Sequence, residues 1–155
     1  MVSIRRQATV AALFAAGFLL GKASAHQGQA AAPTRKPITM TRIYAGPDGH
    51  SHAEEVEMKL SERGIAEFRA TAAQFSSRLA GPPNTNWHTG PRRQFVITLS
   101  GRAEIEVSDG RKVLAGPGHI NLIEDTTGKG HLTRNIEDRI VITIPLADEA
   151  GSPGN

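Results

Sequence analysis

The chain contains no cysteine, a single tryptophan and a single tyrosine. Without cysteine the protein has no disulfide bonds, no thiol nucleophile and no thiolate metal ligand. Any metal must therefore be held by histidine, carboxylate or amide groups. Stability must come from an apolar core, and 155 residues are enough to build one domain with such a core.

An excess of charge of one sign is also missing from most of the chain. The formal charge of +3 comes from 18 Lys and Arg against 15 Asp and Glu. Arg5, Arg6 and Lys22 lie in residues 1–25, which contain no acid, so 15 of the 18 basic side chains remain against 15 acidic ones. This balance, with a lone tryptophan that no basic residues interleave, gives no support for a nucleic-acid partner.

Residues 1–25 have the features of a secretory signal peptide. Arg5 and Arg6 precede the apolar run Ala11–Leu20, and Ala23–Ala25 supplies small residues at the −3 and −1 positions of a cleavage site. A membrane anchor is the alternative, but the run has about ten residues where a span needs roughly twenty. We expect a periplasmic or secreted protein without a membrane span after cleavage, exported by the general or the twin-arginine route.

Composition divides the rest of the chain into three parts. Residues 26–37 are polar, rich in alanine and interrupted by proline, which indicates a flexible linker. Residues 147–155 have the composition of a disordered tail. The folded domain is expected at residues 38–146.

Short strands dominate the expected domain. Apolar residues alternate with polar ones in several segments, and Asp109-Gly110 is a strong hairpin turn between two of them. The expected strands are Thr41–Gly46, Ala53–Leu60, Gln94–Gly101, Arg102–Val107, two within Arg111–Asp125, Gly130–Asn135 and Arg139–Leu146. Residues 61–75 predict a short helix or an irregular turn. The pattern favours an all-β sandwich or barrel with at most one short helix.

Two segments resemble the sequence motifs of the cupin superfamily. The first motif has His, one residue, His, three or four residues, Glu, six residues and Gly. His88, Gly90, Gln94 and Gly101 occupy these places here, so the second His is Gly90 and the Glu is Gln94.

The second cupin motif has Pro, one residue, Gly, two residues, His, three residues and Asn. Thr126, Gly128, His131 and Asn135 occupy these places, and Gly116–His119 resembles the glycine-rich turn that precedes the motif. The resemblance implies a double-stranded β-helix (jelly-roll) barrel with a metal or ligand site inside. It also implies a homodimer.

The residues at the motif positions suit a divalent metal. His88 and Gln94 share one face of a strand by its period of two, and His131 can approach from another strand. Two imidazoles and one amide oxygen suit Zn²⁺, Fe²⁺, Mn²⁺ or Ni²⁺. These neutral ligands leave the ion strongly Lewis-acidic but weakly held, with a coordination position open at Gly90. The alternative is a metal-free pocket in which the same residues hydrogen-bond one another and a ligand.

Four more residues are candidates for a catalytic or binding role in this pocket. Glu124 and Asp125 could act as general acid or base, although Asp125 could also cap the turn that follows. Arg92 could bind an anion or form a salt bridge at the rim. Trp87 could form a wall of the pocket mouth or of the core.

The sequence His50-Ser51-His52 has the spacing with which a strand can grip a metal. Such a pair near a hairpin tip is more often solvated surface, but His52 could replace the ligand lost at Gly90.

We therefore expect an exported cupin that binds a small polar molecule, with a divalent metal at His88, Gln94 and His131 and with Glu124 or Asp125 moving protons. The reaction class would be lyase, isomerase or oxygenase. The alternatives are a metal-free, non-catalytic binding protein and, less favoured, a structural partner subunit.

Overall fold

The computed structural model describes residues 34–82 and 85–147. The expected signal peptide, most of the expected linker and nearly all of the expected tail lie outside these residues. The described part of the chain contains nine strands and no helix. Accordingly, none of its segments forms a helix with the length and apolarity that a bilayer crossing requires.

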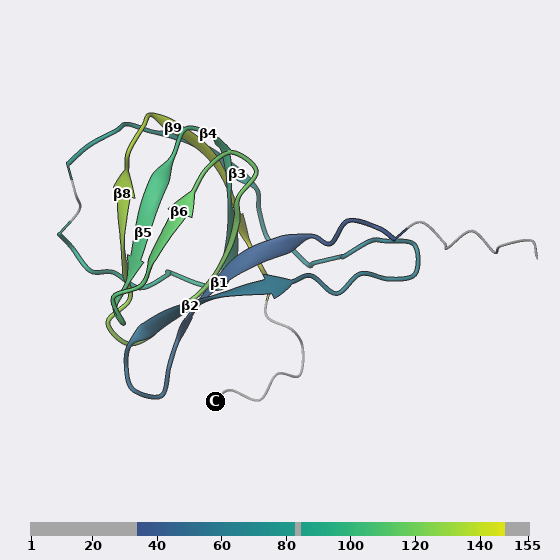
Figure 1. The fold of residues 1–155 in the computed structure, drawn as a ribbon, viewed down its shortest axis with the longest axis horizontal. Coiled ribbons are helices and arrows are strands. Elements are labelled where there is room, and N and C mark those ends of the chain that lie inside the picture. The colour runs from purple at the N-terminus through teal and green to yellow at the C-terminus, as the bar shows by residue number, and fades with distance from the viewer. Residues whose placement is uncertain (1–33, 83–84, 148–155) are drawn as a thin grey trace, which may run out of the picture. The chain divides into compact units, whose positions relative to one another are not determined.

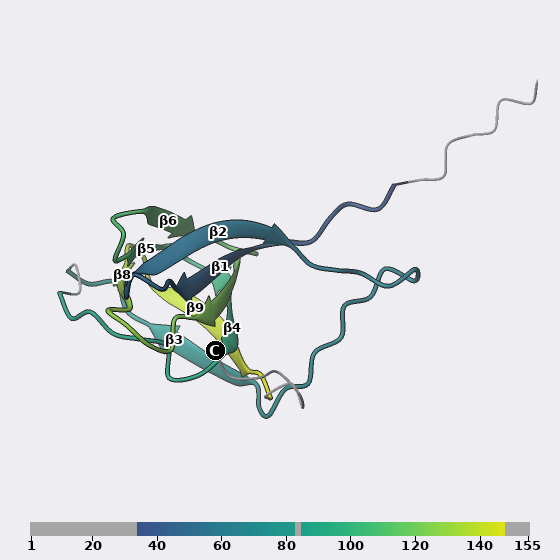
Figure 2. The same ribbon diagram turned by 90° about the horizontal axis from the view of Figure 1, so that it is seen from below.

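The strands form two sheets that face each other (Figure 1). They are β1 (Thr39–Ala45), β2 (Ser51–Glu57), β3 (Gln74–Arg78), β4 (Gln94–Ser100), β5 (Ala103–Val107), β6 (Lys112–Ala115), β7 (Ile120–Glu124), β8 (His131–Asn135) and β9 (Arg139–Pro145). The larger sheet has the order β2-β1-β7-β4-β9-β3, and the smaller one has the order β6-β5-β8. Figure 2 shows the larger sheet curving from β2 at one edge to β3 at the other. The expected all-β class, a double-stranded β-helix barrel, is confirmed.

The strand alternation of β5 supplies the core between the sheets. Ala103, Ile105 and Val107 are between 0% and 4% exposed, as their period of two predicts. Ile43 and Ile123 pack against them from the larger sheet. A second apolar cluster, with Phe95, Leu122 and Leu146 as its buried members, lies on the other face of the larger sheet.

Residues 61–73 are irregular, so the turn alternative for this segment is confirmed and the helix is absent. The helical spacing of Ile65, Phe68 and Phe75 does not produce a continuous buried face, because Ile65 is 46% and Phe75 is 70% exposed. A helix this short needs such a face to be stable. The sequence also failed to predict β3, which begins at Gln74 inside the segment.

Candidate ligand-binding site

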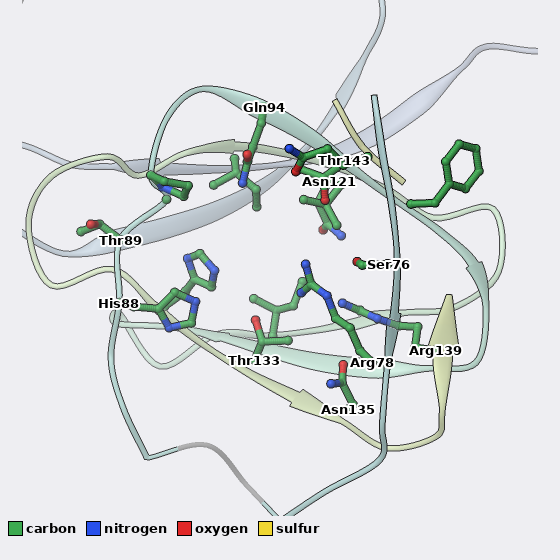
Figure 3. A pocket seen from close by; sticks show the side chains of 18 residues that line it. Ser76, Arg78, His88, Thr89, Gln94, Asn121, Thr133, Asn135, Arg139 and Thr143 are labelled. Atoms are coloured by element: carbon green, nitrogen blue, oxygen red, sulfur yellow. The ribbon is translucent and has the colours of Figure 1, made fainter. Parts of the chain in front are cut away.

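A cavity of about 830 Å³ lies between the two sheets (Figure 3). Side chains of β3, β4, β7 and β9 line it from the larger sheet, and side chains of β5 and β8 line it from the smaller one. Its volume falls within the roughly 300–1,000 Å³ of small-molecule sites. His88, Gln94 and His131 all line this cavity, so the structure brings the three expected ligands together.

His88 and His131 meet across the junction of the two motif segments. The backbone N–H of His88 donates to the carbonyl of His131 at 3.1 Å, and the N–H of His131 donates back to His88 at 2.9 Å. The two imidazole rings lie 4.6 Å apart between centroids. Gly130 permits this approach, since it has a φ of 76° and a Cβ there would collide with the His88 carbonyl.

Asp125 lies behind His131. Its Oδ2 is 2.7 Å from Nδ1 of His131, and its side chain is fully buried. A carboxylate at Nδ1 places the ring proton on that nitrogen, so Nε2 of a neutral His131 keeps its lone pair. Asp125 is not among the cavity-lining residues. It positions the imidazole, and no capping contact of its side chain with the turn is present in the described residues.

Gln94 begins β4 and turns its amide into the cavity (Figure 3). It lines the cavity and forms no side-chain hydrogen bond within the described part of the chain. The amide is therefore available to a ligand or a metal ion. No group of three or more His, Asp or Glu side chains within the described ranges could hold a metal, so a three-ligand site at the histidine pair needs Gln94.

Gly90 lines the cavity beside the two histidines, where the sequence predicted an open coordination position. A Cβ at this position would lie 2.5 Å from Cγ2 of Ile123, so the side chain of Ile123 fills the space where a second motif histidine would begin. The N–H of Gly90 donates to the backbone carbonyl of Asp125 at 3.0 Å. The loop before β4 is thus packed closely against the end of β7.

Glu124 points away from the cavity because Ile123 and Asn121 occupy the inward positions of β7. Its carboxylate accepts hydrogen bonds from Nε of Arg42 at 2.5 Å and from Nε of Arg93 at 2.6 Å. Burial alone would raise the pKa of Glu124, but these two bonds outweigh burial and lower it below its ordinary value. The structure gives Glu124 an ion-pair role and does not bring it to the cavity.

Arg92, Trp87 and His52 do not line the cavity either. Arg92 is exposed, and the salt bridge expected at the rim is formed by its neighbour Arg93. Nζ of Lys129 lies 4.5 Å above the ring of Trp87.

His52 and His50 are held by neighbours at the hairpin between β1 and β2. The two ring nitrogens of His52 contact Asp109 at 2.9 Å and Asp48 at 3.1 Å, and these hydrogen bonds raise the pKa of His52. Nδ1 of His50 lies 3.0 Å from the carbonyl of Ser108. His52 therefore does not supply a ligand in place of Gly90.

The cavity residues that the sequence did not predict include Arg78, Asn121 and Arg139. Arg139 is the first residue of an apolar segment, and by the period of two it shares a strand face with Val141 and Thr143. This pattern could have identified it as inward-facing. Arg78 had no such signal, because β3 was not predicted.

No family model matches the sequence, and no curated protein matches it at a significant level.

Solved structures resemble the fold at low identity. The conserved protein SPY1581 of unknown function from Streptococcus pyogenes is 20% identical, with 56% of this chain and 72% of that chain covered and a TM-score of 0.42. Protein NMB1881 from Neisseria meningitidis is 17% identical, with 55% and 91% covered and a TM-score of 0.40. A candidate ethanolamine utilization protein Q from Salmonella typhimurium LT2 is 13% identical, with 74% and 98% covered and a TM-score of 0.36.

Likenesses at these scores carry no argument about function. The assignment of the fold depends on the chain itself. Its two motif segments meet at His88 and His131 around one cavity, inside two facing sheets. The fold is an all-β barrel of two facing sheets, with the two cupin-like motif segments at one cavity.

Proposed function

We propose that the protein binds a small polar molecule in the cavity beside His88 and His131. The observation that supports this proposal best is the contact of the two imidazoles in a cavity of about 830 Å³, with buried Asp125 fixing the tautomer of His131. Val96, Ile105 and Ile123 supply apolar walls of the cavity. Apolar walls with a few convergent polar groups are typical of small-molecule sites.

The donor set fits a divalent metal ion. His131 presents Nε2 while Nδ1 is engaged by Asp125, which is the arrangement of most metal-ligating histidines. His88 has Nδ1 within 3.1 Å of the carbonyl of Asn86, which leaves its Nε2 available in the same way. Gln94 would be the third ligand. When bound, the metal would supply Lewis-acid polarisation of a ligand carbonyl or hydroxyl.

The residues of the chain itself support proton transfer. When no metal occupies it, Nε2 of His131 can accept a proton from the ligand, and the carboxylate of Asp125 stabilises the imidazolium that forms. Lyase and isomerase reactions need such a transfer, whereas an oxygenase would also need a redox-active metal. Among the acids expected to act here, Asp125 is the one that contacts His131.

A metal-free binding protein is the second candidate. It is favoured by the absence of a third His, Asp or Glu ligand around the two histidines within the described ranges. In that case His88, Gln94 and His131 hydrogen-bond the ligand directly.

Elemental analysis of the mature protein, purified without an affinity tag from its own export route, separates the two candidates. The metal proposal predicts close to one divalent ion per chain and its loss in the His88→Ala/His131→Ala double variant. A wild-type protein that carries no metal and takes up none on titration would refute the metal centre and favour the second candidate.

Export and self-association also stay proposals. N-terminal sequencing of the exported protein should find His26 as the first residue, and light scattering should give the mass of a dimer. An uncleaved N-terminus would contradict the signal peptide, and a monomeric mass would contradict the homodimer.

A further inference from the structure

The cavity extends beyond the two histidines to a pair of arginines on β3 and β9. Arg78 and Arg139 are direct cross-strand partners in this antiparallel pair, and both line the cavity. Figure 3 shows both side chains extending from their strands into the cavity, with the guanidinium groups near each other. Like charges at directly opposite positions destabilise a sheet, so the pair calls for a counter-charge.

Arg139 carries its charge in a buried position. Its residue surface is 2% exposed, and its Nε and Nη1 atoms are buried without an acceptor in the part of the chain that the structure describes. Burial, with the nearby charge of Arg78, lowers the pKa of Arg139 to about 10. The guanidinium still carries its proton at neutral pH. Buried arginines are rare unless they are paired, and an unpaired charge of this kind is costly.

The described part of the chain supplies no carboxylate to this pair. No Asp or Glu lines the cavity. The two acids that precede Arg139 are engaged elsewhere: Glu137 pairs with Arg102 at 2.5 Å, and Asp138 accepts a hydrogen bond from the N–H of Ala80 at 2.8 Å. Among the described residues the pair therefore has no counter-charge, which a bound anion would supply.

Asn121 adds a further donor to the same cavity. It is fully buried, and its Nδ2 has no acceptor among the described residues. Its Oδ1 lies 3.2 Å from Nε2 of His119. Burial lowers the pKa of His119, so the ring is neutral at pH 7 and donates from Nε2 to this oxygen. The amide is thereby held with its N–H₂ group free for a ligand.

We propose that Arg139, Arg78 and Asn121 form an oxyanion subsite, which binds the carboxylate or phosphate group of the molecule held in the cavity. A guanidinium donates two parallel hydrogen bonds to either group. The inference deepens the proposed function and rests on it for the histidine end: the ligand is a small organic anion whose remaining oxygen groups face His88 and His131. Anion binding at the arginines needs no metal.

Thermal unfolding with added anions tests the subsite. Acetate, succinate and inorganic phosphate are compared with chloride at constant ionic strength, in wild type, Arg139→Met and Arg102→Met. Arg102 is the matched control, because it is an exposed arginine outside the cavity. Wild type and Arg102→Met should gain melting temperature with at least one anion, whereas Arg139→Met should not respond. A response to carboxylates alone or to phosphate alone identifies the class of ligand.

The proposal also predicts that removing the buried charge of Arg139 raises the melting temperature. Without added anion, Arg139→Met should melt about 2–5 °C above wild type, because an unpaired buried charge is replaced by an apolar side chain of similar volume. If Arg139 merely supports the fold, this variant will melt lower and keep its response to anions, which would overturn the subsite. Should Arg139→Met not fold, half-buried Arg78→Gln takes its place with the same expected loss of response.

The His88→Ala/His131→Ala variant separates this inference from the proposed function. It should keep its response to anions, since neither arginine depends on the histidines. A wild type that responds to no anion overturns the subsite whatever its metal content. A metal-free wild type that does respond leaves the subsite standing and removes the metal centre.

Discussion

At the scale of single residues, the site depends on how Asp125 orients His131. Its carboxylate is fully buried, and one oxygen lies 2.7 Å from Nδ1 of His131. The other oxygen, Oδ1, has no donor within the described residues. A buried carboxylate retained at this position indicates a positioning role for Asp125, since the protein forgoes one hydrogen bond to keep it.

Replacing Asp125 by asparagine should weaken metal binding about 10–100-fold, as loss of such an outer partner does elsewhere. The amide can donate to Nδ1, which moves the ring proton to Nε2 and removes the lone pair that a metal needs. Titration of the metal-free protein with Zn²⁺ measures the loss. Glu137→Gln, the same change at an exposed carboxylate, should bind as wild type does. Equal affinity in Asp125→Asn would contradict the positioning role.

Gly90 is a second residue with a specific steric requirement. Gly90→Ala should lower the free energy of unfolding by about 1–3 kcal/mol, because a Cβ there would lie 2.5 Å from Cγ2 of Ile123. The matched control is Gly116→Ala, whose Cβ would meet its nearest neighbour, Cγ of Arg102, at 3.9 Å. Denaturant unfolding of both variants checks the difference. Similar stabilities would show that Ile123 moves aside at no cost.

At the scale of elements, one carboxylate links three adjacent segments of the larger sheet. Glu124 on β7 accepts from Arg42 on β1 and from Arg93 just before β4. Its side chain is 18% exposed, while the arginines are 39% and 35% exposed. Solvent screens the arginines in part, so the stabilisation is smaller than for a fully buried pair.

Glu124→Gln should lower the free energy of unfolding at pH 7 by about 1–2 kcal/mol. The pKa of Glu124 is lowered from 4.5 in the folded protein, so its contribution is present above pH 4.5 and is lost as the pH falls through the folded pKa. Melting temperatures between pH 7 and pH 3 should show the two proteins converging in acid. Glu104→Gln, at a more exposed pair with Lys112, should show a smaller gap throughout. A gap for Glu124→Gln that persists in acid would contradict the ion-pair account.

Most strands could be predicted, because alternation on a half-buried surface is a local signal. The strand β5 shows this, since each inward residue of its pattern is buried. The strand β3 could not be predicted, because Gln74, Ser76 and Ser77 lack β propensity and pairing with β9 supplies its stability. The helical spacing of residues 61–75 was misleading, because no neighbouring surface buries the apolar face that a helix there would present.

At the scale of the whole molecule, the site could be predicted only in part. Period two placed His88 and Gln94 on one face, and the second motif supplied His131. Parity also indicates that Glu124 faces away from the cavity, because Asn121 and Ile123 occupy the inward positions of its strand. The arginine pair depends on the pairing of β3 with β9, which joins residues far apart in the chain. The sequence thus predicted the histidine end of the cavity and missed the cationic end formed by the two arginines.

The central claim is that His88 and His131 present their Nε2 atoms together to the cavity. Long-range ¹H–¹⁵N spectra of the imidazoles during titration with Zn²⁺ test it most directly. We expect the Nε2 signals of His88 and His131 to shift together at one equivalent, while the proton on Nδ1 of His131 stays there, donated to the carboxylate of Asp125. Shifts confined to His50 and His52 at the hairpin, or none at all, would contradict the claim.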